Sequence, residues 1–81
     1  MSIRVLFFAT IADVTGKREM KLDASAHANV ASIYSRLAQE CPGLEARRAS
    51  VLCAVNSEFA RPDSPVHDGD EVAFFPPVSG G

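Results

Sequence analysis

The sequence predicts a single α+β domain, a roll in which a mixed sheet of about five strands has one main helix on one face. Three features predict this class: β-branched and aromatic residues crowd the N-terminus, one central segment has apolar residues at helical spacing, and a strand-like run ends close to the C-terminus. At 81 residues the chain forms one domain at most, with room for one modest core but not for a deep substrate cavity as well. A self-contained enzyme is therefore not expected.

The first two strands are expected to form a hairpin. Residues 2–9 are rich in β-branched and aromatic types, and residues 19–22 alternate between polar and apolar. Gly16-Lys17 lies between them and suits a turn.

The main helix is expected to begin after Asn29. Its side chain suits an N-cap, because it can accept a hydrogen bond from a free backbone N–H of the first turn. The apolar residues that follow at helical spacing are Val30, Ile33, Tyr34, Leu37 and Cys41. Pro42-Gly43 is expected to stop the helix.

Three further strands complete the order β-β-α-β-β-β. After a short charged connection, residues 51–55 resemble a buried strand, which turns near residues 56–58 into a brief strand at Phe59 and Ala60. The last strand, residues 71–75, follows a turn at residues 68–70, where Asp68 and Asp70 flank Gly69 as turn formers and not as a paired acid and base.

Composition and charge exclude several classes of function. With 8 Lys and Arg against 10 Asp and Glu, the net charge of -2 lacks the basic footprint of a nucleic-acid-binding domain. No apolar run approaches the ~20 residues of a membrane span, and no export signal is recognised. The two cysteines have no CxxC spacing and the two histidines are not clustered with other ligands, so we expect a cytoplasmic protein with reduced thiols and no metal. Cys41, Cys53, His27 and His67 are interpreted as packing or loop residues, and Arg47-Arg48 as a solvated face.

A sheet with a helix on one side leaves its other face to solvent, and alternation predicts which residues point there. In the first strand Arg4 marks the solvent face and places Leu6 and Phe8 beside it. In the last strand Glu71 marks the same face and places Phe75 on it. If these strands are neighbours, their apolar residues form a partner-binding patch rimmed by Arg4 and Glu71, and Phe59 extends it. The alternative is that a bulge or a loop covers them.

The C-terminus carries the predicted chemistry. The last strand runs directly into Pro76-Pro77, which favours an extended exit, and the sequence closes with Gly80 and Gly81. Glycine has no Cβ, so this pair suits a narrow channel in another protein and leaves the terminal carbonyl open to attack. A carboxylate must be activated first, and the chain has no phosphate-binding loop, so a separate enzyme is expected to activate it. The alternative is an inert, solvated terminus.

Three blocks of sequence resemble the small, sulfur-carrying subunits of molybdopterin synthase. They are residues 5–9 (Val-Leu-Phe-Phe-Ala), residues 54–56 (Ala-Val-Asn) and residues 68–81, which end in Phe-Phe-Pro-Pro-Val-Ser-Gly-Gly. The resemblance implies a ubiquitin-like β-grasp domain over residues 1–76 and an extended Gly-Gly tail over residues 77–81.

The resemblance also implies the mechanism. In that family an adenylyltransferase related to ubiquitin-activating enzymes uses ATP and magnesium to form an acyl-adenylate on the final glycine, here Gly81, and a sulfur donor protein converts it to a thiocarboxylate. The tail then enters the large catalytic subunit, where its sulfur goes to cyclic pyranopterin monophosphate to form the dithiolene of molybdopterin, in a heterotetramer. The small subunit has no catalytic side chains and no permanently bound cofactor. By this resemblance Gly81 carries the reacting atom, Gly80 gives access, and the docking residues are Phe8, Phe59, Phe75, Pro76, Pro77 and Val78.

Other functions share the same C-terminal chemistry. A carrier of this kind also serves thiamine synthesis or tRNA thiolation, and a ubiquitin-like modifier forms isopeptide bonds through its last glycine. The Phe-Phe-Pro-Pro ending favours the molybdenum cofactor. A β-grasp iron–sulfur ferredoxin is excluded, because two cysteines cannot supply four thiolate ligands.

Overall fold

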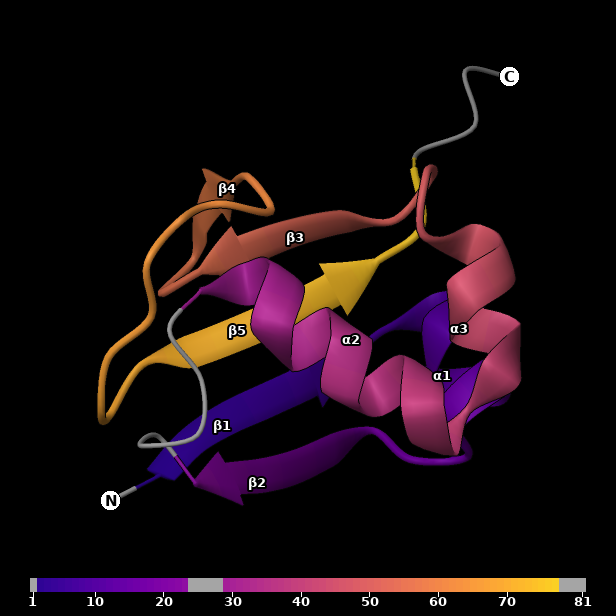
Figure 1. The fold of residues 1–81 in the computed structure, drawn as a ribbon, viewed down its shortest axis with the longest axis horizontal. Coiled ribbons are helices and arrows are strands. Elements are labelled where there is room, and N and C mark those ends of the chain that lie inside the picture. The colour runs from indigo at the N-terminus through magenta and orange to yellow at the C-terminus, as the bar shows by residue number, and fades with distance from the viewer. Residues whose placement is uncertain (1, 24–28, 78–81) are drawn as a thin grey trace.

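The computed structural model describes residues 2–23 and 29–77. Its elements in chain order are β1 (Ser2–Phe7), α1 (Ala9–Thr15), β2 (Glu19–Asp23), α2 (Val30–Glu40), α3 (Pro42–Arg47), β3 (Leu52–Val55), β4 (Glu58–Ala60) and β5 (Glu71–Phe75). The strands form one sheet in the order β2-β1-β5-β3-β4; α2 lies across one face of it, and α1 and α3 pack together at one end (Figure 1). The predicted α+β class with a five-stranded mixed sheet is confirmed.

The sheet is mixed because β1 and β5 lie side by side in parallel. The β1–β2, β3–β5 and β3–β4 pairs are antiparallel. A parallel pair needs a crossover connection, and the chain between β1 and β5 supplies it by passing over the sheet as α2. The predicted patch depends on the first and last strands being neighbours, and this condition is met.

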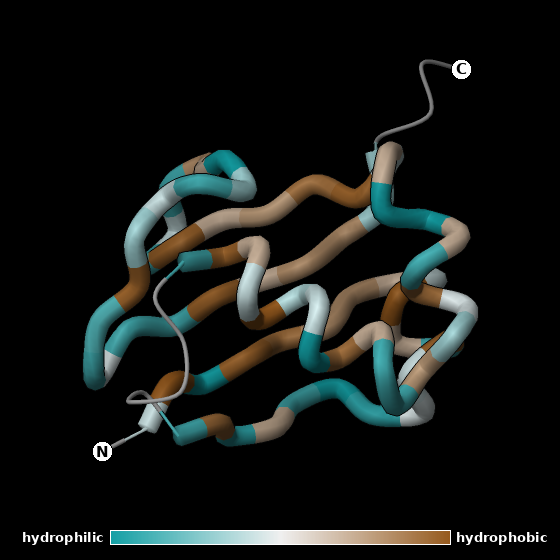
Figure 2. Tube along the Cα trace, in the orientation of Figure 1, coloured by the Kyte–Doolittle hydropathy of each residue, from teal (hydrophilic) through white to brown (hydrophobic). Residues whose placement is uncertain are grey.

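The core lies between the sheet and α2. Alternation along β1 and β5 points one set of side chains at the helix, and the buried residues of these elements are Ile3, Val5, Phe7, Val72, Phe74, Val30, Ile33, Tyr34 and Leu37. Phe74 lies at the centre, with its ring centroid 6.5 Å from that of Phe7 and 5.4 Å from that of Tyr34. Figure 2 shows apolar residues along the central strands and a largely hydrophilic β2.

Helix α2 begins as the sequence predicts. The Asn29 side chain accepts a hydrogen bond from the Ser32 backbone N–H at 2.8 Å, and the Ser32 hydroxyl accepts one from the Asn29 N–H at 3.2 Å, which completes a capping box. The helix has 11 residues. Among residues 2–23 and 29–77, no helix is long and apolar enough to cross a membrane.

Two short helices replace connections that the sequence analysis interpreted as a turn and a charged linker. Helix α1 occupies most of the predicted hairpin connection and ends at Gly16, whose positive φ of 74° makes it the C-cap. Helix α3 starts at Pro42, the residue predicted only as a stop, because proline is well suited to the first position of a new helix. Each of these helices buries a single residue, Ile11 in α1 and Leu44 in α3, which is too little apolar periodicity to signal a helix.

Replacing Ala9 by glycine is expected to stabilise the fold. Ala9 has a φ of 51°, in the left-handed region, where the Cβ of an L-residue is strained by roughly 1–2 kcal/mol. Urea unfolding should show Ala9→Gly gaining about 1 kcal/mol, reduced by the greater entropy of glycine in the unfolded chain. The matched control is Ala12→Gly in the same helix, which should lose about 1 kcal/mol. A loss of stability in both variants would contradict a left-handed backbone at position 9.

A hydrogen-bonded turn network ties the start of β5 to the β3–β4 hairpin. Asn56 and Ser57 both have positive φ, 52° and 70°, as in a type I′ turn. The Asn56 amide accepts from the Glu71 N–H and donates to Asp70 Oδ1, both at 3.0 Å, while the His67 N–H donates to Asp70 Oδ2 at 2.8 Å. The predicted turn at residues 68–70 is present. Gly69 has a φ of 88°, and the Asp68 side chain accepts a hydrogen bond from the Ser2 N–H at 2.8 Å.

Acid is expected to weaken the fold through Asp70. The hydrogen bond from Asn56 first, and then that from the His67 backbone, lower the pKa of Asp70 below its ordinary value of 3.8. A carboxylate whose pKa is lower in the folded protein than in the unfolded chain stabilises the fold at pH values above its unfolded pKa. This stabilisation is lost as the pH falls through the pKa of the folded protein. The Asp70→Asn variant should therefore be less stable than the parent at neutral pH, by under about 1 kcal/mol, with the gap closing below about pH 4. Urea unfolding across this range measures it, and a gap independent of pH would contradict it.

Candidate functional site

The face of the sheet opposite α2 carries an apolar patch. Alternation and strand register place one row of side chains across four strands: Leu6 of β1 is opposite Ala73 of β5, Ala73 is opposite Ala54 of β3, and Ala54 is opposite Phe59 of β4. A second row joins Leu52 to Phe75 through the β3–β5 register. Among the described residues, the exposed large apolar side chains are Phe8 at 49%, Leu52 at 38% and Phe59 at 82%, and all three belong to this patch. Exposed apolar residues gathered in this way mark an interaction surface.

The aromatic residues predicted to form this surface are brought together, with one correction. Phe59 packs on Phe75 with ring centroids 5.9 Å apart, and the Phe8 N–H donates to the Phe74 carbonyl at 3.1 Å, which extends the parallel ladder and sets Phe8 beside Phe75. Phe75 was predicted to be exposed but is half-buried, because the ring of Phe59 lies against it. No loop of the described structure covers Phe8 or Phe59.

A charged group borders the patch on the same face. Arg4 forms ion pairs with Glu19 of β2 and, at 3.2 Å, with Glu71 of β5, so it links three adjacent strands. The hydrogen bond and charge of Glu19 raise the pKa of Arg4, which keeps the guanidinium charged. Arg4 and Glu71 were predicted as the rim of the patch, and their position is confirmed.

The C-terminal segment leaves the sheet directly from this patch. β5 ends at Phe75, followed by half-buried Pro76 and exposed Pro77. The predicted site residues Val78, Gly80 and Gly81 lie outside the described residues, as does His27.

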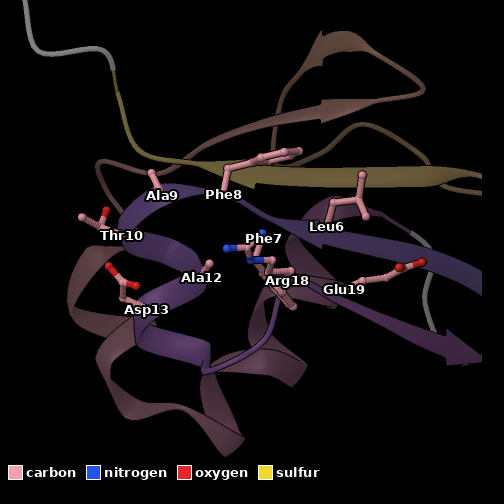
Figure 3. Close-up of a pocket in the computed structure, with 9 residues that line it drawn as sticks. All are labelled: Leu6, Phe7, Phe8, Ala9, Thr10, Ala12, Asp13, Arg18 and Glu19. Carbon is pink, nitrogen blue, oxygen red and sulfur yellow. The ribbon is translucent and has the colours of Figure 1, made fainter.

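An open hollow adjoins the patch at the end of β1 and the start of β2 (Figure 3). Its volume is about 720 Å³, and its lining residues are Leu6, Phe7, Phe8, Ala9, Thr10, Ala12, Asp13, Arg18 and Glu19. Sequence analysis missed this hollow, because helix α1 forms one of its walls. It also missed Leu52 and Ala54, although their alternation with Cys53 was a usable signal.

The remaining polar candidates are structural. Cys53 is buried, its thiol donates to the Ala60 carbonyl at 3.3 Å, and burial raises the pKa of that thiol, so it is a poor nucleophile at neutral pH. Cys41 packs against the core. In the described part of the chain no three His, Cys, Asp or Glu side chains are grouped as metal ligands. Arg47 is exposed as predicted, whereas Arg48 also packs 5.1 Å above the Tyr34 ring and pairs with Glu45 at 2.9 Å.

This sheet order, with one face under a helix and the other open beside the exit of the last strand, defines a ubiquitin-like β-grasp protein. Within that class the chain belongs to the ThiS family, which it matches over residues 5–81.

Curated relatives agree with this assignment. The chain is 37% identical to the molybdopterin synthase sulfur carrier subunit of Escherichia coli, over 98% of the chain and 99% of the relative. It is 34% identical to the protein of the same name from Chlamydomonas reinhardtii, over the full length of both. Among solved structures, small archaeal modifier protein 1 of Haloferax volcanii superposes with a TM-score of 0.81 at 29% identity, over 95% of this chain and 98% of that one. The resemblance and the β-grasp fold expected from the sequence are confirmed.

Proposed function

We propose that this protein is the sulfur carrier subunit of a molybdopterin synthase and that Gly81 carries the sulfur as a thiocarboxylate. The observation that carries the proposal is the exit of β5 from an open apolar face into Pro76-Pro77 and a sequence that closes with two glycines. The full-length likeness to proteins named as sulfur carrier subunits of this synthase supports it.

The reaction at Gly81 has two steps before delivery. In the adenylyltransferase, with ATP and magnesium, the Gly81 carboxylate displaces pyrophosphate and becomes an acyl-adenylate. The terminal sulfur of a cysteine persulfide on a sulfur donor protein then attacks the carbonyl carbon, and AMP leaves. A thiol cleaves the S–S bond of the resulting acyl disulfide, which releases the thiocarboxylate and leaves the donor cysteine and that thiol joined as a disulfide. In the large catalytic subunit the terminal sulfur passes to cyclic pyranopterin monophosphate, and water restores the Gly81 carboxylate. A second charged carrier supplies the other sulfur of the dithiolene. The protein serves as a cosubstrate in the cytoplasm and holds no permanent cofactor.

The folded domain contributes the docking surface and restricts the direction in which the C-terminal tail leaves it. Phe8, Phe59 and Phe75 form the docking surface with Pro76, Pro77 and Val78, and the two prolines restrict φ where the tail begins. Gly80 gives the tail access to a narrow channel. The adenylyltransferase and the large subunit must accept the same tail from the same origin, so they bind this face in turn and compete for it. Two carriers on a dimer of large subunits form the heterotetramer.

The proposal is tested by intact-mass analysis after incubation with the adenylyltransferase, ATP, magnesium and a sulfur donor. We expect one oxygen at the C-terminus to be exchanged for sulfur, and we expect the product to support molybdopterin synthesis when the large subunit and cyclic pyranopterin monophosphate are added. A terminus that stays unmodified under these conditions would overturn the carrier function. A terminus that gains sulfur but supports no molybdopterin synthesis would assign the carrier to another pathway, such as thiamine synthesis or tRNA thiolation.

A second candidate function is covalent modification of other proteins. The likeness to a Haloferax volcanii protein named as a modifier favours it. It predicts conjugates of higher mass in the native host that vanish when Gly81 is deleted, whereas a carrier alone forms none.

A further inference from the structure

The hollow beside the patch is built from three segments that meet at one corner of the sheet. Leu6 comes from the end of β1 and Phe8 directly follows that strand, while Thr10 and Asp13 belong to α1. Arg18 is the residue before β2. Figure 3 shows Arg18 between the end of β1 and the start of β2, facing the space that Phe8 and α1 border.

The hollow is continuous with the proposed docking surface. Leu6 and Phe8 line it and also belong to the apolar patch, and Phe8, 49% exposed, stands between the two. A partner that covers Phe8 and Phe75 therefore also covers the mouth of the hollow.

Arg18 is the cationic residue among those that line the hollow. Its side chain is exposed and has no carboxylate within ion-pair distance in the described structure, neither Asp13 across the hollow nor its neighbour Glu19, which is held by Arg4. Covering a guanidinium with protein costs free energy unless the covering surface supplies hydrogen-bond acceptors. A carboxylate supplies acceptors and the opposite charge together, so an acidic side chain is the partner that the charge of Arg18 favours.

The backbone at the rim is strained in the way that binding sites often are. Ala9 follows Phe8 with a φ of 51°, in the left-handed region, at the point where the chain passes from β1 into α1. Such strain is common at functional sites, and here it accompanies the turn that places α1 as a wall of the hollow.

We propose that the hollow between β1, α1 and the start of β2 receives a loop of the large catalytic subunit, and that an aspartate or glutamate of that loop pairs with Arg18. This proposal rests on the proposed function and extends it. It assigns a charged specificity contact to a surface that is otherwise apolar, and electrostatic contacts of this kind select the partner and speed its association.

The test measures binding of the full chain to the purified large subunit by calorimetry at two salt concentrations. Arg18→Glu should weaken binding at least about tenfold, Arg18→Gln by less, and Arg18→Lys by under about threefold, because lysine keeps the charge. Salt should weaken binding of the parent more than that of Arg18→Gln.

The matched control is Arg36→Glu, which makes the same charge change on α2, on the other face of the sheet. If Arg18→Glu binds as tightly as Arg36→Glu, the inference is wrong even though the proposed function stands. If the parent chain does not bind the large subunit at all, the proposed function itself fails. Arg18 is exposed, so thermal unfolding of its variants should match the parent and exclude misfolding as the cause.

Discussion

A chain that lacks Gly81 is expected to yield no molybdopterin above background in a reconstituted synthase, while it still binds the large subunit. The shortened chain keeps a terminal carboxylate, now on Gly80, but this group is set back by up to about 3.5 Å along the tail. Acyl activation and sulfur delivery both require the carbonyl carbon within reach of a reacting atom, and a shift of even 1 Å in such a geometry costs on the order of a hundredfold in rate. Two consecutive chemical steps depend on this position, so the loss should be complete.

Two readouts separate this chemical defect from a docking defect. Binding measured by calorimetry should stay within a few fold of the parent, because the patch formed by Phe8, Phe59 and Phe75 is unchanged. A Ser79→Ala variant, which changes the tail but not its length, serves as the matched control and should retain activity. Full activity without Gly81 would show that the reacting group lies elsewhere and would remove the basis for a C-terminal carrier.

The sequence predicted those elements whose apolar residues repeat at regular spacing over several turns of helix or several residues of strand. Helix α2 has three turns with a clear apolar stripe and a side-chain N-cap, and alternation in β1 and β5 is anchored by Arg4 and Glu71, so their faces were predicted correctly. Helices α1 and α3 were missed because six or seven residues with one buried side chain carry no period. Helix α1 is held by tertiary contacts with α3 and the sheet, and α3 by contacts with α1 and α2, which local sequence does not reveal.

The same distinction applies to the candidate site. Phe8 was identified as exposed because strand alternation is a local property, and Phe59 was placed as an extension of the same patch. The partial burial of Phe75 depends on where the β3–β4 turn places Phe59, and that placement follows from the positive φ angles at Asn56 and Ser57. The hollow depends on α1, so it was not accessible to sequence reasoning at all. The residues of the predicted patch were correct, but the hollow beside it was not predicted.

Replacing Phe59 by alanine is expected to weaken binding to both partners by about thirtyfold or more while leaving the fold nearly intact. The ring is 82% exposed, so its removal loses little buried area, and the contact with Phe75 contributes at most about 1 kcal/mol to stability. In the proposed complexes the same ring is covered by the partner, and truncating a buried aromatic anchor typically costs 2 kcal/mol or more of binding free energy. A variant with near-normal urea unfolding and a large loss of affinity would therefore assign Phe59 to the interface and not to the core.

The neighbouring residue provides the control. Glu58 lies on the same short strand with its side chain on the opposite side, so Glu58→Ala should bind both partners as the parent does. In the proposed function the adenylyltransferase and the large subunit accept the same tail at the same origin, so their affinities for Phe59→Ala should fall together. If the adenylyltransferase bound this variant at full affinity while the large subunit lost it, the two partners would use different faces. The carrier could then stay docked on one partner while the other approached, and competition would no longer order the two steps.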